Sequence, residues 1–146
     1  MNLFEKSRAV KAVFEELEAE SRQFHAEAGM ACLPGCGFCC ANPEVPASPL
    51  EFLPLAFDLY EKGIAEEIAN QLSEEEKPGN CIVYRSQKED QTKGFCGNYT
   101  NRGLICRLFG AAARKNKHGQ KELITCKILK EEKAENYSST ALRINS

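Results

Sequence analysis

The apolar positions near the N-terminus recur every three to four residues, which is the period of one face of an α-helix. Charged residues fill most of the positions between them, and a glycine follows at position 29. The pattern predicts one amphipathic helix over residues 3–28 that ends at Gly29. Its apolar face would carry Leu3, Val10, Val13, Phe14, Leu17, Phe24 and Ala28.

A second helical pattern begins at residue 48. Ser48 can cap the helix, Pro49 suits its first turn, and Glu51 completes a capping box. Apolar residues continue at helical spacing as far as Gly63, which closes the helix. Pro54 falls in the second turn, so we expect it to bend this helix.

The pattern becomes less regular downstream, where short apolar runs alternate with polar segments and turn residues. In chain order, the sequence first predicts a helix at 64–72 with a charged end at 73–77, a turn at 78–80 and a strand at 81–84. A hairpin loop at 85–93 follows, then a second apolar run at 94–96 and an apolar segment of undecided type at 104–110. The last predicted elements are a turn at 116–119, a strand at 123–126, a polar helix at 127–135 and a weakly ordered tail at 136–146. Helices followed by short strands indicate an α+β class that is mainly helical.

Four of the eight cysteines fall within nine residues, in the segment Cys32-Leu33-Pro34-Gly35-Cys36-Gly37-Phe38-Cys39-Cys40. Cys36 and Cys39 form a Cys-x2-Cys pair, which places two thiolates on one side of a tight turn, where both can reach one metal ion. Gly37 inside this turn would supply a positive φ and room for a close backbone approach. The segment therefore predicts a metal-binding turn.

The adjacent pair Cys39-Cys40 has a different consequence. Neighbouring side chains point in different directions in regular structure, so we expect these sulfurs to serve two sites, two irons of one cluster or a bridging arrangement. Eight thiolates suffice for two four-thiolate centres or for one composite centre that also uses the later cysteines. The predicted metal ligands are Cys32, Cys36, Cys39, Cys40, Cys81, Cys96, Cys106 and Cys126.

Disulfides and unligated thiols are the alternatives to metal binding. The N-terminal residues contain no unbroken apolar stretch of the kind found in secretory signals. No segment approaches the roughly 20 apolar residues that a membrane-spanning helix needs. We therefore expect a cytoplasmic protein, and in that compartment thiols stay reduced and cysteine clusters favour metal.

The cysteine pattern resembles that of the YkgJ-type cysteine-cluster family, which carries a zinc- or iron-chelating CxxCxxCC domain. The likeness covers about residues 30–127: the segment 32–40, Cys81 at the start of an apolar stretch, Cys96-Gly97-Asn98-Tyr99, the run from Arg102 to Gly110, and Cys126. The first cysteine spacing is one residue longer than in the family, and Gly103 and Gly110 replace two prolines.

The resemblance implies chelation of zinc or iron. It also implies kinship with flagellin lysine methylases, for which an iron–sulfur cluster is the expected cofactor. Arg107 belongs to the family run, and two roles are open for it: stabilising thiolate charge from beside the ligands, or pairing with a glutamate.

These observations predict one small domain organised around a cysteine-ligated metal centre. Its parts are an N-terminal helix at 1–29, a cysteine-cluster domain at 30–127, and a polar helix and tail at 128–146. The net charge of −2 does not favour nucleic acid or an anionic membrane as partner, and a protein partner is left open. The basic stretch from Arg102 to Lys121 is interpreted as a solvated loop, with an acidic or phosphate-bearing partner as the alternative.

Motifs of classical catalysis are missing from the sequence: there is no Ser/His/Asp order, paired-carboxylate motif or phosphate-binding loop. We therefore expect a metal-binding module rather than an enzyme, with a structural role or a role in metal storage and delivery. The alternative is an iron–sulfur redox or radical-type component.

Overall fold

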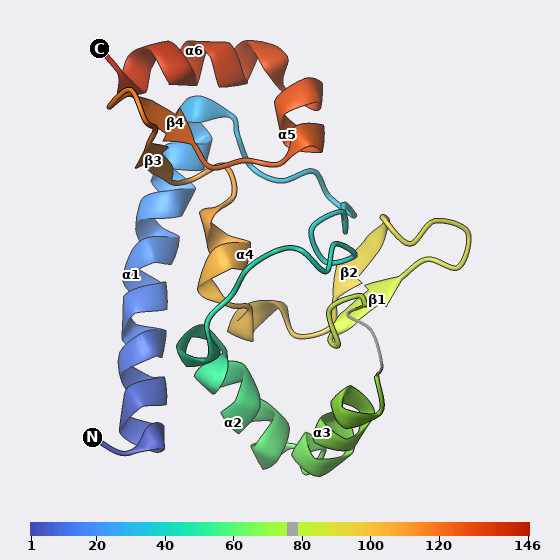
Figure 1. Ribbon diagram of the computed structural model, residues 1–146. Helices are drawn as coiled ribbons and strands as arrows, with labels where there is room; N and C mark the ends of the chain where they lie inside the picture. The colour runs from blue at the N-terminus through green and yellow to red at the C-terminus, as the bar shows by residue number, and fades with distance from the viewer. Residues whose placement is uncertain (76–78) are drawn as a thin grey trace. The chain divides into compact units, whose positions relative to one another are not determined.

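The computed structural model describes residues 1–75 and 79–146 (Figure 1). It is mainly helical with two short antiparallel hairpins, which confirms the predicted α+β class. Residues 76–78, the last part of the predicted charged helix end and the first residue of the predicted turn, lie outside the described residues. The elements are α1 (Leu3–Ala28), the 3-10 helix η1 (Pro49–Phe52), α2 (Leu53–Glu61), α3 (Ala65–Glu74), β1 (Tyr84–Ser86), β2 (Gly94–Cys96), the 3-10 helix η2 (Tyr99–Asn101), α4 (Leu104–Leu108), β3 (Ala113–Lys115), β4 (Lys121–Leu123), α5 (Lys127–Glu132) and α6 (Ala134–Ile144).

The chain divides into two compact units. Unit 1 comprises Met1–Phe14 and the described part of Gly35–Leu104, and unit 2 comprises Glu15–Pro34 and Ile105–Ser146. Helix α1 contributes residues to both units. The cysteines are divided as well: unit 1 contains Cys36, Cys39, Cys40, Cys81 and Cys96, and unit 2 contains Cys32, Cys106 and Cys126.

Helix α1 confirms the first prediction, because it runs over the predicted residues and ends immediately before Gly29. Gly29 has φ of 66°, a left-handed conformation that glycine adopts at no steric cost. The side-chain amide of Asn136 donates a hydrogen bond to the carbonyl oxygen of Ala28 at 3.1 Å. A carbonyl left without a partner at the helix end is thereby satisfied within unit 2.

The second predicted helix is divided into two elements. Glu51 completes the predicted capping box by accepting a hydrogen bond from the backbone N–H of Ser48 at 3.0 Å, but the turn that follows is the 3-10 helix η1. Pro54 is the second residue of α2 rather than an interior residue, so its missing N–H is one that would have no helical partner in any case. Leu55 and Leu59 of α2 pack with Val83 to form the core of unit 1.

The first hairpin lies in unit 1 and pairs Tyr84 with Cys96 and Ser86 with Gly94. The predicted strand at 81–84 was therefore placed about three residues too early. Cys81 belongs instead to a turn, in which its carbonyl oxygen accepts a hydrogen bond from the Tyr84 N–H at 3.0 Å. The loop between the strands confirms the predicted hairpin connection.

The second hairpin lies in unit 2 and differs from the prediction in its strands. β3 was not predicted, and β4 lies before Cys126 rather than including it. The predicted turn is confirmed, because the side-chain oxygen of Asn116 accepts hydrogen bonds from the backbone N–H groups of His118 and Gln120 at 2.9 and 3.0 Å. The apolar segment of undecided type contains α4.

The C-terminal tail was predicted to be weakly ordered, and this prediction is wrong. Residues 134–144 form α6, which lies beside the second hairpin (Figure 1). The side-chain amide of Asn145 exchanges two hydrogen bonds of 2.8 Å with the backbone of Lys121. Tyr137 and Ile144 pack against the core of unit 2, which contains the fully buried Met30 and Leu129. These contacts hold a segment whose own sequence is mostly polar.

Across the described ranges, no helix combines the length and the apolar character that crossing a membrane requires.

Candidate metal centre

The cysteine turn, residues 36–40, lies against the first hairpin in unit 1. Cys36 forms an isolated antiparallel bridge with Lys93, and the N–H of Gly37 donates a hydrogen bond to the carbonyl oxygen of Thr92 at 2.6 Å. These bonds attach the turn to residues that immediately precede β2. The position of the turn is therefore fixed by backbone pairing rather than by its own sequence alone.

Two later cysteines join the cysteine turn through the same hairpin. The N–H of Cys81 donates a hydrogen bond to the carbonyl oxygen of Cys40 at 2.7 Å. Cys96 lies opposite Tyr84 in the register of the two strands, and directly opposed residues place their side chains on the same face of a sheet. Backbone hydrogen bonds thus bring together the chain segments that carry all five cysteines of unit 1.

The thiol of Cys39 interacts with the thiol of its neighbour Cys40. The Cys40 side chain hydrogen-bonds to the Cys39 side chain, which requires neighbouring sulfurs in an irregular turn. This hydrogen bond is the largest cause that lowers the pKa of Cys39, which falls to about 7 although burial acts in the opposite direction. A thiol with this pKa is substantially ionised at neutral pH, and the thiolate is the form that binds metal.

Of the two roles expected for Gly37, the positive φ is wrong. Its φ is not positive, whereas Gly35, just before the turn, has φ of 74°. A methyl group at Gly37 would overlap the phenol oxygen and ring of Tyr84. Glycine is needed here because an aromatic side chain lies directly on the backbone.

Tyr84 is the residue of this site that sequence reasoning missed. It is 7% exposed, and its hydroxyl donates a hydrogen bond to the carbonyl oxygen of Gln91 at 2.8 Å. Burial raises the pKa of Tyr84, and negative charge on Cys40, Cys36 and Cys39 raises it further. The phenol therefore remains a neutral hydrogen-bond donor. The sequence did not mark Tyr84 as a site residue, because tyrosine is common in strands whether or not they carry a site.

The cysteines of unit 2 occupy different local environments. Cys126 caps α5, and its sulfur accepts a hydrogen bond from the N–H of Leu129 at 3.4 Å. The same side chain packs against the core that contains Met30, two residues before Cys32. Cys106 lies in the short helix α4. Each of these thiols is attached to a separate element of unit 2.

Arg107, the neighbour of Cys106, makes a buried ion pair with α1. Its guanidinium lies 2.7 Å from the carboxylate of Glu18, and the side chains are 7% and 32% exposed. This pair supports the second of the two roles left open by the sequence, pairing with a glutamate. It fixes α4 to α1 within unit 2.

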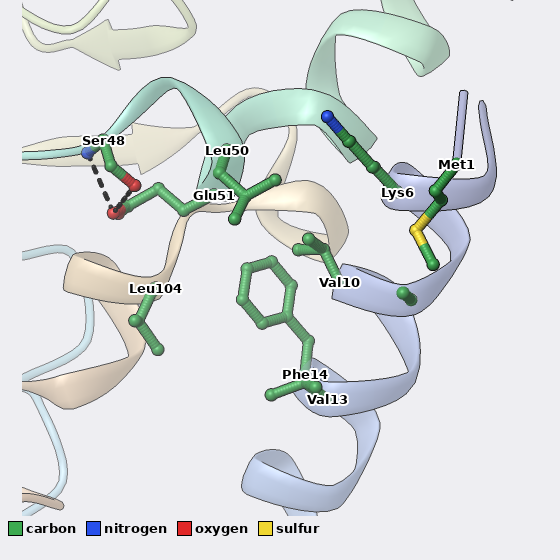
Figure 2. A pocket seen from close by; sticks show the side chains of 10 residues that line it. Met1, Lys6, Val10, Val13, Phe14, Ser48, Leu50, Glu51 and Leu104 are labelled. Atoms are coloured by element: carbon green, nitrogen blue, oxygen red, sulfur yellow. Dashed lines mark hydrogen bonds between the residues drawn. The ribbon is translucent and has the colours of Figure 1, made fainter. Parts of the chain in front are cut away.

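A cavity of about 470 Å³ lies elsewhere in unit 1, between the first part of α1 and η1 (Figure 2). Its walls are mainly apolar side chains, among them Val10, Phe14 and Leu50. The carboxylate of Glu51 is turned toward Ser48, as the dashed lines in Figure 2 show. No cysteine or histidine of the described chain lines this cavity, so it contributes no soft metal ligand.

The eight cysteines are present as thiols, without disulfide bonds among them in the described chain. Within residues 1–75 and 79–146, no three Cys, His, Asp or Glu side chains lie close enough together to hold one metal ion. The donor chemistry nevertheless fits zinc or iron, because thiolates are the ligands that closed zinc and iron–sulfur sites use. Metal binding would have to draw these thiolates together.

No curated protein and no solved structure matches the chain. A family model named CxxCxxCC and described as a "putative zinc- or iron-chelating domain" matches residues 31–138, which is most of the chain. The N-terminal helix α1 lies outside the matched residues. The chain belongs to this CxxCxxCC family of zinc- or iron-chelating domains.

Proposed function

We propose that the chain binds zinc or iron through its cysteine thiolates. The observation that carries this proposal is the convergence of five cysteine-bearing positions on one hairpin of unit 1, together with the lowered pKa of Cys39. Five thiols exceed the four that a tetrahedral zinc site requires. The proposed ligands are Cys36, Cys39, Cys40, Cys81 and Cys96 in unit 1, and Cys32, Cys106 and Cys126 in unit 2.

Such a site would strongly affect the stability of this small chain. Closed thiolate sites contribute roughly 10–16 kcal/mol of apparent binding free energy in zinc peptides. A whole domain has a free energy of unfolding of about 5–15 kcal/mol. The hairpin and the cysteine turn would hold the sulfurs, and a bound ion would neutralise the charge of several thiolates at once. Protein without metal should therefore be much less stable than protein with metal.

The test is metal analysis of protein purified anaerobically under reducing conditions. We expect near-stoichiometric zinc or iron, and a large loss of metal in Cys36→Ser and Cys81→Ser. A single composite centre predicts that Cys126→Ser loses as much metal as Cys36→Ser, whereas independent centres predict that Cys126→Ser keeps the metal of unit 1. Protein that contains neither metal in appreciable amount would contradict the proposal.

An iron–sulfur redox component is the second candidate, and the hydrogen-bonded sulfurs of Cys39 and Cys40 favour it. Two adjacent thiolates can ligate neighbouring irons of one cluster. Anaerobic protein would then be brown, absorb visible light and contain acid-labile sulfide. Colourless protein loaded with zinc under the same conditions would exclude this candidate and leave the first one standing.

A further inference from the structure

One residue, Tyr84, is joined to every cysteine-bearing segment of unit 1, to Cys81 and Cys96 through its backbone and to the cysteine turn through its ring. Tyr84 is the first residue of β1, and its N–H donates a hydrogen bond to the carbonyl oxygen of Cys81. Across the hairpin it lies opposite Cys96. Its ring lies on Gly37, between Cys36 and Cys39 in the sequence of the cysteine turn.

The phenol is anchored as well as buried. Its hydroxyl donates a hydrogen bond to the carbonyl oxygen of Gln91, and the next residue, Thr92, accepts the hydrogen bond from the N–H of Gly37. A second backbone bond joins Gly94 to Gly35 at 3.0 Å. The ring is thus held between the loop of the hairpin and the backbone of the cysteine turn, so neither can shift without displacing it.

We propose that Tyr84 is a positioning residue for the metal centre of unit 1, and that Gly37 provides the space its ring requires. This inference rests on the proposed function, since it needs a metal bound by the cysteine turn. Tyr84 does not ligate the ion. It sets the distance between the cysteine turn and the hairpin that carries Cys81 and Cys96.

The expected loss of metal affinity can be judged from substitutions at other metal sites. Substituting residues that orient the ligands typically costs 10–100-fold in metal affinity. Tyr84→Leu keeps an apolar side chain but removes the ring and hydroxyl, so we expect an affinity loss of about tenfold or more. Tyr84→Phe keeps the ring and loses one hydrogen bond, so the loss should stay below about tenfold.

The experiment is a titration of the metal-free 146-residue chain with Co²⁺. Thiolate ligation gives a near-ultraviolet charge-transfer band, and tetrahedral geometry gives visible bands. The variants are Tyr84→Phe, Tyr84→Leu, Gly37→Ala, and the double variant Gly37→Ala with Tyr84→Leu. Gly37→Ala should weaken binding strongly in the wild-type background and little in the Tyr84→Leu background, because the added methyl then meets no ring. The matched control is Phe14→Leu, which truncates another buried aromatic residue of unit 1 at the cavity in Figure 2.

Each outcome has a distinct meaning. If Tyr84 positions the metal centre, Tyr84→Leu binds Co²⁺ more weakly and with shifted visible bands, whereas the bands of Phe14→Leu are unchanged. If Cys36→Ser abolishes the charge-transfer band and Tyr84→Leu leaves affinity and spectrum unchanged, the proposed function stands and the role of Tyr84 is refuted. Additive losses for Gly37→Ala and Tyr84→Leu would refute it too. Wild-type protein without a charge-transfer band would overturn the proposed function itself.

Discussion

Replacing Gly110 with alanine should destabilise unit 2 more than the same change at any open glycine turn. Gly110 has φ of 78°, and its N–H donates a hydrogen bond of 2.7 Å to the carbonyl oxygen of Ile124. A methyl group there would overlap the carbonyl oxygen of Met30 and lie 3.2 Å from a methyl carbon of Leu129. Met30 and Leu129 are the two largest fully buried side chains among the described residues.

The expected cost has two parts. A left-handed conformation costs a residue with a β-carbon about 1–2 kcal/mol. Overpacking against backbone and core atoms typically adds about 1–3 kcal/mol. Gly110→Ala should therefore lower the free energy of unfolding by about 2–5 kcal/mol. Gly119 is the matched control, because it has φ of 76° and nothing within 4 Å of the added methyl. Gly119→Ala should cost only the first part.

Urea unfolding of wild type, Gly110→Ala and Gly119→Ala measures both costs, with the metal content kept the same in all three proteins. With a typical slope of about 1–3 kcal/mol per molar urea, Gly110→Ala should shift the midpoint by about 1 M or more. Equal midpoints for the two alanine variants would refute the reasoning. That result would mean that the carbonyl of Met30 does not lie against Gly110.

Three further predictions concern charged and ionisable groups. Arg107→Met should lower the free energy of unfolding by about 1–3 kcal/mol. The loss should be smaller than for a fully buried pair because Glu18 is 32% exposed, and an unchanged thermal midpoint would count against the ion pair. Asp58→Ala should cost about 1 kcal/mol at neutral pH, since Asp58 accepts a 2.7 Å hydrogen bond from Asn98. The pKa of Asp58 is lowered by Lys62 and Asn98, so its contribution exists above the unfolded pKa and is lost as pH falls through the folded value; a cost that persists in acid would contradict this. In metal-free protein, alkylation of Cys39 should be half-maximal near pH 7, and a midpoint at the ordinary thiol value would exclude the sulfur hydrogen bond.

Local sequence signals predicted the parts of the fold that depend on local chemistry. The amphipathic period of residues 3–28 and the glycine after it gave both ends of α1. The turn at Asn116 was predicted because an asparagine side chain satisfies nearby backbone N–H groups by itself. In contrast, α6 depends on a partner distant in sequence, through the contact between Asn145 and Lys121, so its own residues gave no clear signal. The three residues of β3 are all exposed, so they show no alternation of apolar and polar positions that would have predicted a strand.

The candidate site likewise has features that the local sequence predicts and features that depend on contacts distant in sequence. Cysteine spacing identified the residues that carry thiols, but their arrangement depends on pairing between the turn and a hairpin some fifty residues later. The sequence rule for neighbouring side chains applies to helices and strands, whereas Cys39 and Cys40 lie in a turn, so it could not predict the hydrogen bond between their side chains. Tyr84 and the reason for Gly37 emerge only from that tertiary contact.

X-ray absorption spectroscopy at the zinc or iron edge, on anaerobically purified protein, would identify the ligand atoms around the bound metal and so decide whether the cysteine thiolates bind it. Thiolate ligation predicts a first shell of sulfur at about 2.3 Å, with about four sulfurs per zinc ion. An additional metal–metal distance would indicate an iron–sulfur cluster. A first shell made only of nitrogen and oxygen would contradict thiolate ligation.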